Sequence, residues 1–164
     1  MTMDENKRIR LDRMRYIKNS LSSRLALLSI VFNVLYFVSI YQSDVGSWYY
    51  TLLIGGSIVY NLLFMLMAFL ASEGVKNYKL GYAVLLLALG AGQFVRMFYL
   101  PVKAHAATVT ISKVTYTVMG DGQFAWVLVC LALSAACAIG AGVVGVRRSW
   151  MLAAYVASLE QKDA

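Results

Sequence analysis

The chain has 164 residues, of which 60% are hydrophobic and 14% are charged, and it carries a formal net charge of +7. Soluble domains have about 45–50% apolar and about 25% charged residues, so this composition excludes an ordinary soluble enzyme and favours a membrane protein. With a single histidine and two cysteines, the chain also lacks the side chains for a histidine-ligated haem or a cluster of metal ligands.

The first 24 residues are polar and basic, and they contain seven of the fifteen Lys and Arg residues. We expect residues 1–24 to be a cytoplasmic leader without a cleavable signal peptide. Met14, Ile17 and Leu21 follow helical spacing, which leaves two interpretations open. The leader either only fixes the orientation of the chain, or forms a surface helix that docks a partner.

Four apolar runs follow, with lengths of 17, 24, 21 and 23 residues, and they cover residues 25–41, 48–71, 80–100 and 124–146. A bilayer core about 30 Å thick is crossed by about 20 apolar residues of helix. The sequence therefore predicts an all-α integral membrane protein, a bundle of four transmembrane helices in a single membrane domain. The connections between the first three runs are short, so those helices are expected to be antiparallel neighbours.

The basic residues are distributed unevenly over the predicted connections. Twelve lie in the two terminal segments and the 72–79 connection, whereas Lys103 and Lys113 lie in the 101–123 connection. By the positive-inside rule both termini are cytoplasmic, and the 101–123 loop is external. We expect a multi-pass protein of the plasma membrane whose basic excess contacts anionic lipid headgroups. The same distribution argues against nucleic-acid binding.

Two segments outside the runs carry further patterns. Residues 108–119 largely alternate polar with apolar side chains and are rich in β-branched residues, which predicts a strand or small hairpin lying across the external face. Residues 147–164 are expected to form a cytoplasmic tail with a short interfacial helix.

One ionisable residue, Arg96, lies inside an apolar run, about 24 Å along the third helix and near its external end. One hypothesis is that its guanidinium snorkels to the interface. The other is that Arg96 and Gln93 form a polar patch that binds an anionic group or a partner's carboxylate. In that case Asp44 or Asp121 is the candidate intramolecular counter-ion.

Asn33 and Asn61 are both predicted to lie near mid-bilayer. We expect them to hydrogen-bond each other across a helix pair, a contact that contributes about 0.6–2 kcal/mol. The alternative is that they line a site for a small polar solute.

Small residues predict close approach of helices, because they let backbones pack against each other. The candidate packing positions are Gly55, Gly56, Gly90, Gly92, Ala136, Gly140, Gly142 and Gly145. The fourth run has two small faces, so one is available for a second subunit. Cys130 and Cys137 are seven residues apart on one helix, too far to bridge, and are expected to be packing residues.

None of the four runs contains Asp or Glu, and no catalytic, cofactor or metal site is predicted. The leading hypothesis is a non-catalytic accessory or scaffolding subunit of a membrane complex, for example of a transporter, with other membrane protein subunits as partners. The alternative is a small homo-oligomeric transporter or channel for a small polar or anionic solute. Its path would be lined by Asn33, Asn61, Gln93 and Arg96.

Overall fold

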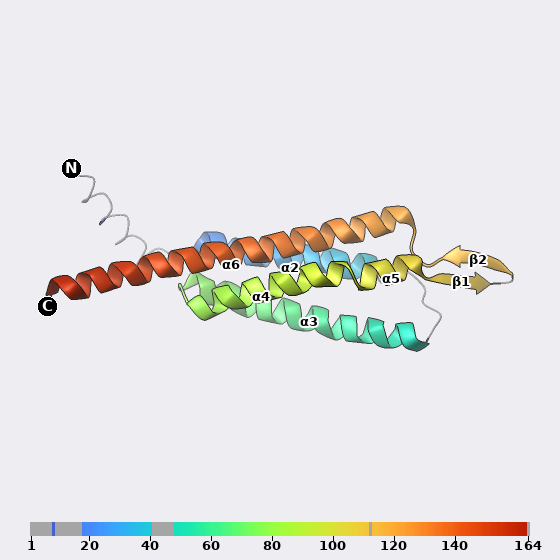
Figure 1. The fold of residues 1–164 in the computed structure, drawn as a ribbon, viewed down its shortest axis with the longest axis horizontal. Helices are drawn as coiled ribbons and strands as arrows, with labels where there is room; N and C mark the ends of the chain where they lie inside the picture. Colours follow the sequence, from blue (N-terminus) through green and yellow to red (C-terminus); the bar gives the residue numbers. More distant parts are fainter. Residues whose placement is uncertain (1–7, 9–17, 41–47, 112, 164) are drawn as a thin grey trace.

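The computed structural model describes residues 8, 18–40, 48–111 and 113–163 (Figure 1). Four of its helices are long and apolar enough to cross a membrane, so the four predicted apolar helices are confirmed, as a multi-pass membrane protein requires. The elements in chain order are α2 (Ser20–Ile40), α3 (Trp48–Lys76), α4 (Leu80–Met97), α5 (Leu100–Ala106), β1 (Thr108–Ile111), β2 (Val114–Thr117) and α6 (Asp121–Asp163).

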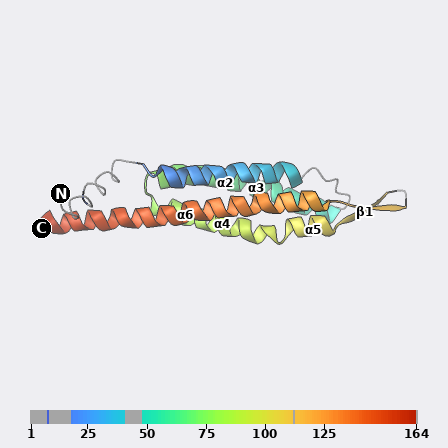
Figure 2. The same ribbon diagram turned by 90° about the horizontal axis from the view of Figure 1, so that it is seen from above.

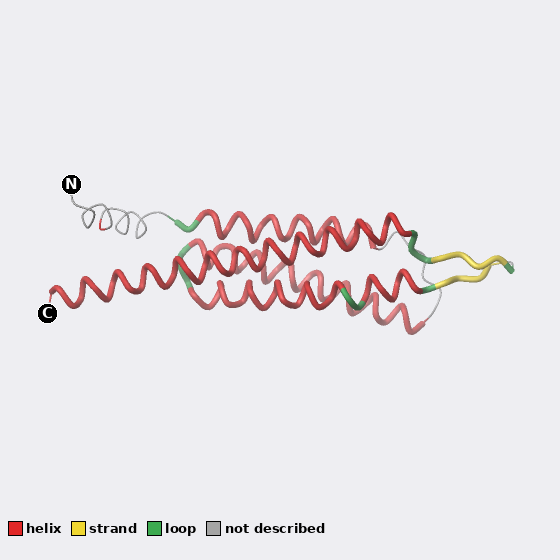
Figure 3. Tube along the Cα trace, turned by 45° about the horizontal axis from the view of Figure 1, so that its top comes forward, coloured by secondary structure: helices red, strands yellow, loops and turns green. Residues whose placement is uncertain are grey.

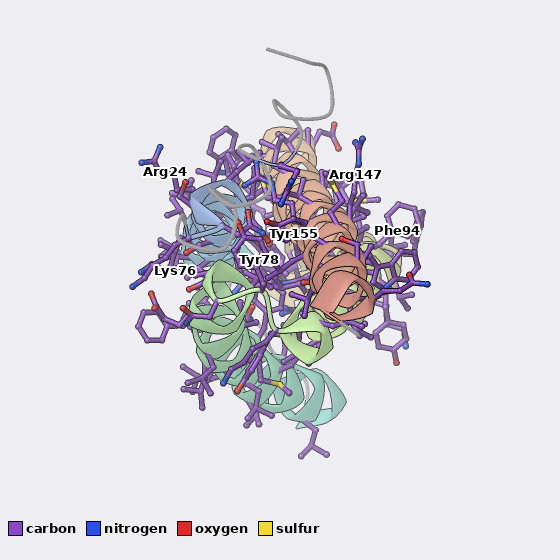
Figure 4. All side chains as sticks on the ribbon, turned by 90° about the vertical axis from the view of Figure 1, so that its left-hand side faces the viewer. Arg24, Lys76, Tyr78, Phe94, Arg147 and Tyr155 are labelled. Atoms are coloured by element: carbon purple, nitrogen blue, oxygen red, sulfur yellow. The ribbon has the colours of Figure 1, made fainter. Side chains whose placement is uncertain are left out.

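The long helices pack side by side in the order α2, α3, α4, α6 around the bundle, as the view along the bundle in Figure 4 shows. Helix α6 contacts both α2 and α4, and α3 contacts the same two helices from the opposite side. Helices α2 and α4 therefore face each other diagonally across the interior. We call the end of the bundle that carries β1 and β2 the hairpin end, and the opposite end the terminal end.

Helix α2 shows that the bundle is built with its polar side chains inward. Its buried positions include Ser22, Ser29 and Asn33, whereas Val31 and Val38 are exposed. In water this arrangement would be unfavourable, because it would expose apolar side chains to the solvent. In a bilayer it is favourable, because lipid accepts the apolar face and the buried polar groups bond across helices. Ser29 and Ser134 show such bonding, each hydroxyl donating to the other's carbonyl at 2.9 Å.

Hydrogen bonds tie the helices together at the terminal end. The backbone N–H of Asn19 donates to the carbonyl of Lys76 at 2.9 Å, which joins the start of α2 to the end of α3. The side-chain oxygen of Asn19 accepts from Arg148 on α6 at 3.1 Å. Ser149 donates to the carbonyl of Tyr78 at 3.0 Å, in the turn between α3 and α4. Basic side chains such as Arg24 and Arg147 point outward around this end (Figure 4).

The connection from α4 to α6 is more ordered than a loop. A short break at Phe98 and Tyr99 (Figure 3) is followed by α5, which begins at Leu100 with Pro101 in its first turn, where the missing N–H is tolerated. Strands β1 and β2 then pair antiparallel, from Thr108↔Thr117 to Ile111↔Val114.

The hairpin points away from the bundle along its long axis (Figures 1 and 2). The expectation that it lies across the end of the bundle is therefore wrong. The described side chains of its strands are exposed, so they do not pack against the helices.

Helix α6 is the other difference from the predicted elements. It runs without a break for 43 residues, about 65 Å, and extends past the other helices at the terminal end (Figure 1). The helix predicted in residues 147–164 is therefore not a separate element, because it continues the helix of the fourth apolar run. No proline or glycine follows Gly145 to stop the helix, and residues 147–159 are mostly good helix formers. The expected surface helix at Met14 and Ile17 lies outside the described residues.

Candidate functional site

Two layers of polar side chains cross the interior between α2, α3 and α4. The first joins Asn33 of α2 to Gln93 of α4, with the Gln93 amide N–H donating to the Asn33 oxygen at 2.7 Å. Both side chains are fully buried, and each residue lies 13 positions after the first residue of its helix. The side-chain amide nitrogen of Asn33 and the side-chain oxygen of Gln93 have no hydrogen-bond partner among the described residues.

The second layer, one turn nearer the hairpin end, is centred on the guanidinium of Arg96. Its Nη1 donates to the Oδ1 of Asn61 at 2.8 Å. Its Nη2 donates to the hydroxyl of Tyr36 at 3.1 Å and also to the hydroxyl of Ser57. One cation from α4 is thus held by α2 and α3, and these three bonds use three of the five N–H donors of a guanidinium.

Aromatic faces complete the surroundings of Arg96. The guanidinium carbon lies 4.6 Å from the ring centre of Tyr36 and 4.9 Å from that of Tyr60. Such contacts attract a cation by about 0.5–2 kcal/mol each. The amide of Asn61 donates to the carbonyl of Ser57 at 3.0 Å, which turns its oxygen toward Arg96. Neutral groups therefore solvate the guanidinium without neutralising its charge.

No carboxylate of the described chain lies within ion-pair distance of Arg96. Asp121, a candidate counter-ion from the sequence, is 99% exposed and lies 3.6 Å from His105 instead. Asp44 lies outside the described residues. The positive charge of Arg96 is accordingly uncompensated within the described part of the bundle, an arrangement that is unfavourable in a medium of low polarity.

Two sequence-based hypotheses about these residues are wrong. Asn33 and Asn61 do not bond each other, because each bonds a residue of α4, Gln93 and Arg96 respectively. Arg96 does not snorkel toward the end of the bundle, because its guanidinium turns inward and contacts Tyr36 and Asn61 at its own level. Tyr36 lies three residues after Asn33, and Ser57 lies four residues before Asn61 and three before Tyr60. This helical spacing is the sign in the sequence that these side chains share faces with the asparagines.

Arg96 also lines a pocket of about 390 Å³ between α3 and the α4–α5 segment. The pocket lies where α3 diverges from α4 toward the hairpin end (Figure 1). Its walls are largely apolar, and polar groups converge at one position. The lining residues are Leu52, Gly56, Ser57, Tyr60, Gly92, Val95, Arg96, Tyr99 and Leu100.

Two glycines of the predicted packing set border this pocket, and they differ in their surroundings. A Cβ at Gly92 would lie 2.7 Å from the hydroxyl of Tyr60, so the absence of a side chain there lets Tyr60 approach Arg96. A Cβ at Gly56 would meet nothing within 4 Å, which leaves space at the pocket wall.

The remaining predicted packing positions differ in how closely a neighbouring helix approaches them. Gly90, Gly142 and Gly145 lie at tight contacts of α4 with α6, where an added Cβ would come within 3.0 Å of a neighbour. Gly140 lies in ordinary contact with Leu25, 3.9 Å from an added Cβ, whereas Ala136 is exposed. Gly55 has nothing within 4 Å. Cys130 is buried and Cys137 half-buried, and both are free thiols.

The arrangement provides hydrogen-bond donors and one positive charge in a pocket. Within the described ranges no three His, Cys, Asp or Glu side chains are grouped so that they could hold a metal ion. Comparison of the chain with protein-family models, with curated proteins and with solved structures finds no significant match.

Proposed function

We propose that this is a non-catalytic multi-pass membrane protein that binds a ligand with an anionic group at Arg96. The observation that carries the proposal is the uncompensated guanidinium of Arg96 at the wall of a pocket. Arg96 is half-buried, and a cation used only for packing would be expected to meet a carboxylate, because an unpaired charge withdrawn from water is destabilising. Two N–H donors of Arg96 have no acceptor in the described bundle, and they are available to a bound oxyanion.

Binding is favoured over conduction through a single chain. On the terminal side of the polar layers lies an apolar cluster of small and branched side chains, formed by Ala26, Ala71, Val75, Ala83, Leu86 and Ala141. The buried hydroxyls at this level donate to backbone carbonyls and are not arranged as a polar path, as Ser22, Ser29 and Ser72 show. A channel would therefore need a second route, for example between copies of the chain.

The proposal includes an orientation in the plasma membrane. The excess of Lys and Arg near the terminal end supports a cytoplasmic location for both termini. The Arg96 pocket would then lie in the external half of the bilayer.

Thermal unfolding of the purified protein in mild detergent tests the binding proposal. The probes are sodium phosphate and phosphatidylglycerol, compared with sodium chloride and phosphatidylcholine at constant ionic strength. We expect at least one anionic probe to raise the unfolding temperature by about 5 °C at saturation, because ligand bound only to the folded state stabilises it.

Arg96→Gln should lose this rise, whereas Lys79→Gln should keep it. Lys79 is exposed, lies at the terminal end and carries the same charge, so it is the matched control for overall electrostatics. The proposal fails if neither probe stabilises the wild-type chain, or if Arg96→Gln responds as the wild type does.

A second candidate is an accessory subunit of a membrane complex, favoured by the extension of α6 beyond the other helices. Trp150, Met151 and Val156 are exposed apolar residues on this extension, where a partner would bury them. Gentle purification should then recover an unrelated protein in stoichiometric amount that is lost when α6 is shortened after Ser149. Recovery of this chain alone would exclude a stable complex.

A further inference from the structure

We propose that the ligand of the Arg96 pocket is an anionic membrane lipid, whose phosphate contacts Arg96 and which enters from the bilayer between α3 and α4. This inference rests on the proposed function, because it identifies the chemical class of the anion bound there.

The walls of the pocket are the first reason. Leu52 of α3 and Val95 of α4 line it, and they are also 58% and 68% exposed on the surface that faces lipid. The pocket therefore continues into the apolar surface of the bundle. An acyl chain gains by contact with such walls, whereas a small hydrophilic anion gains nothing from them and is compensated for lost hydration only at Arg96.

The depth of Arg96 is the second reason. It lies 16 residues after Leu80, about 24 Å along α4, and the hydrocarbon core is about 30 Å thick. With Leu80 taken as the level of the opposite interface, Arg96 lies within about 6 Å of the interface at the hairpin end, the level at which lipid phosphates begin. A phosphate drawn slightly inward reaches its free donors while the acyl chains stay in the hydrocarbon core.

A second cation contacts one of the residues that line the pocket. The Nζ of Lys103 on α5 is 4.7 Å from the ring centre of Tyr99, and it lies 3.4 Å from the hydroxyl of that residue. Tyr99 itself lines the pocket, so a second positive charge contacts a residue of the pocket wall. Two positive charges about two turns apart in sequence fit a headgroup with a negative phosphate.

The absence of a side chain at Gly56 supplies a sharp experiment. Gly56→Phe places a ring at the pocket wall without removing any charge, since an added Cβ there meets no neighbour. Gly55→Phe is the matched control, because Gly55 is the adjacent residue, is equally free of neighbours and does not line the pocket. Both variants add the same apolar volume to α3.

Native mass spectrometry of the full chain, titrated with phosphatidylglycerol, measures the occupancy of bound lipid. We expect Arg96→Gln and Gly56→Phe each to weaken the tightest binding of lipid by roughly tenfold or more. Arg96→Gln removes a charge-assisted hydrogen bond to the phosphate, and Gly56→Phe fills the space that the lipid would occupy. Gly55→Phe and Lys79→Gln should remain within about twofold of the wild type. Glycerophosphoglycerol, the same headgroup without acyl chains, should bind at least about 100-fold more weakly, since it buries no acyl surface.

The outcomes separate the two proposals. If glycerophosphoglycerol or inorganic phosphate binds as well as the lipid, and does so through Arg96, the lipid inference is overturned and the proposed function stands. If phosphatidylglycerol binding is equal in Gly56→Phe and Gly55→Phe, the lipid does not occupy this pocket. If no anion depends on Arg96, both proposals fail. A stoichiometric membrane protein that occupies the pocket in place of lipid, and is lost in Gly56→Phe, also overturns the lipid inference.

Discussion

Tyr60 connects a glycine on α4 to the cation one turn further along the same helix. Its hydroxyl occupies the space beside Gly92 and its ring lies over Arg96, so the absence of a side chain at position 92 sets the position of an aromatic face. A small residue in this helix therefore does more than let two backbones approach. It places a polar aromatic ring against a charge.

Gly92→Ala should displace Tyr60 from Arg96 and lower the free energy of unfolding by about 0.5–2 kcal/mol, the size of a cation–π contact. In a Tyr60→Phe background the same substitution should have little further effect, because the hydroxyl that the Cβ meets is absent. Unfolding titrations with SDS in mixed micelles measure both values. Equal losses from Gly92→Ala in the two backgrounds would show that the hydroxyl contact does not set the position of the ring.

The Asn33–Gln93 layer is a second test at the scale of single side chains. Asn33→Leu or Gln93→Leu alone leaves the other buried amide without its partner, so each should destabilise the bundle by about 1–3 kcal/mol. The double variant should lose less than the sum of the two. A coupling energy of about 0.6–1.7 kcal/mol from the double-mutant cycle is expected. Strict additivity would mean that the 2.7 Å hydrogen bond contributes nothing to stability.

Among the helices, the contact of α4 with α6 depends on positions without side chains. At Gly90 an added Cβ would lie 2.5 Å from the Cγ1 of Ile139 and 3.0 Å from its backbone nitrogen. Because a backbone atom cannot move aside as a side-chain end does, the two helices would have to separate. Overpacking of this kind is destabilising by about 1–3 kcal/mol.

Gly90→Ala should therefore lower the free energy of unfolding by that amount. Gly55→Ala has the opposite expected sign, because nothing lies within 4 Å of its Cβ and alanine favours helix by up to about 1 kcal/mol over glycine. The two variants make the same chemical change on transmembrane helices, so their difference isolates packing. Similar effects of both substitutions would contradict the close approach of α4 and α6 at Gly90.

The same helices show what the sequence predicts well and what it does not. The number of spans follows from run length and hydropathy, because bilayer thickness acts on every helix in the same way. Helix α5 was not predicted, since Leu100 and Ala104 become buried only through contacts with residues distant in the chain. The partners of Arg96 were likewise unpredictable. Helical stripes identify a face, but they do not specify which helix lies diagonally across the interior.

For the whole molecule, the uneven charge is the feature that predicts orientation in the membrane. Four spans place both termini on the same side of the membrane whichever way the chain inserts. Lys79 lies at the terminal end with most of the basic residues, and Lys113 lies in the turn of the hairpin. The cost of moving many cations across a membrane favours insertion with the terminal end in the cytoplasm.

Cysteine labelling in intact bacteria tests this orientation, after Cys130 and Cys137 have been replaced by alanine. A membrane-impermeant maleimide should react with Lys113→Cys in intact cells, and with Lys79→Cys only after permeabilisation, since both positions are exposed. The opposite pattern would place Arg96 in the cytoplasmic half of the bilayer. A lipid that reaches Arg96 laterally would then come from the inner leaflet. In either orientation, the protein can be reconstituted with phosphatidylglycerol confined to one leaflet. This lipid should stabilise the protein only when its leaflet is on the same side of the membrane as position 113.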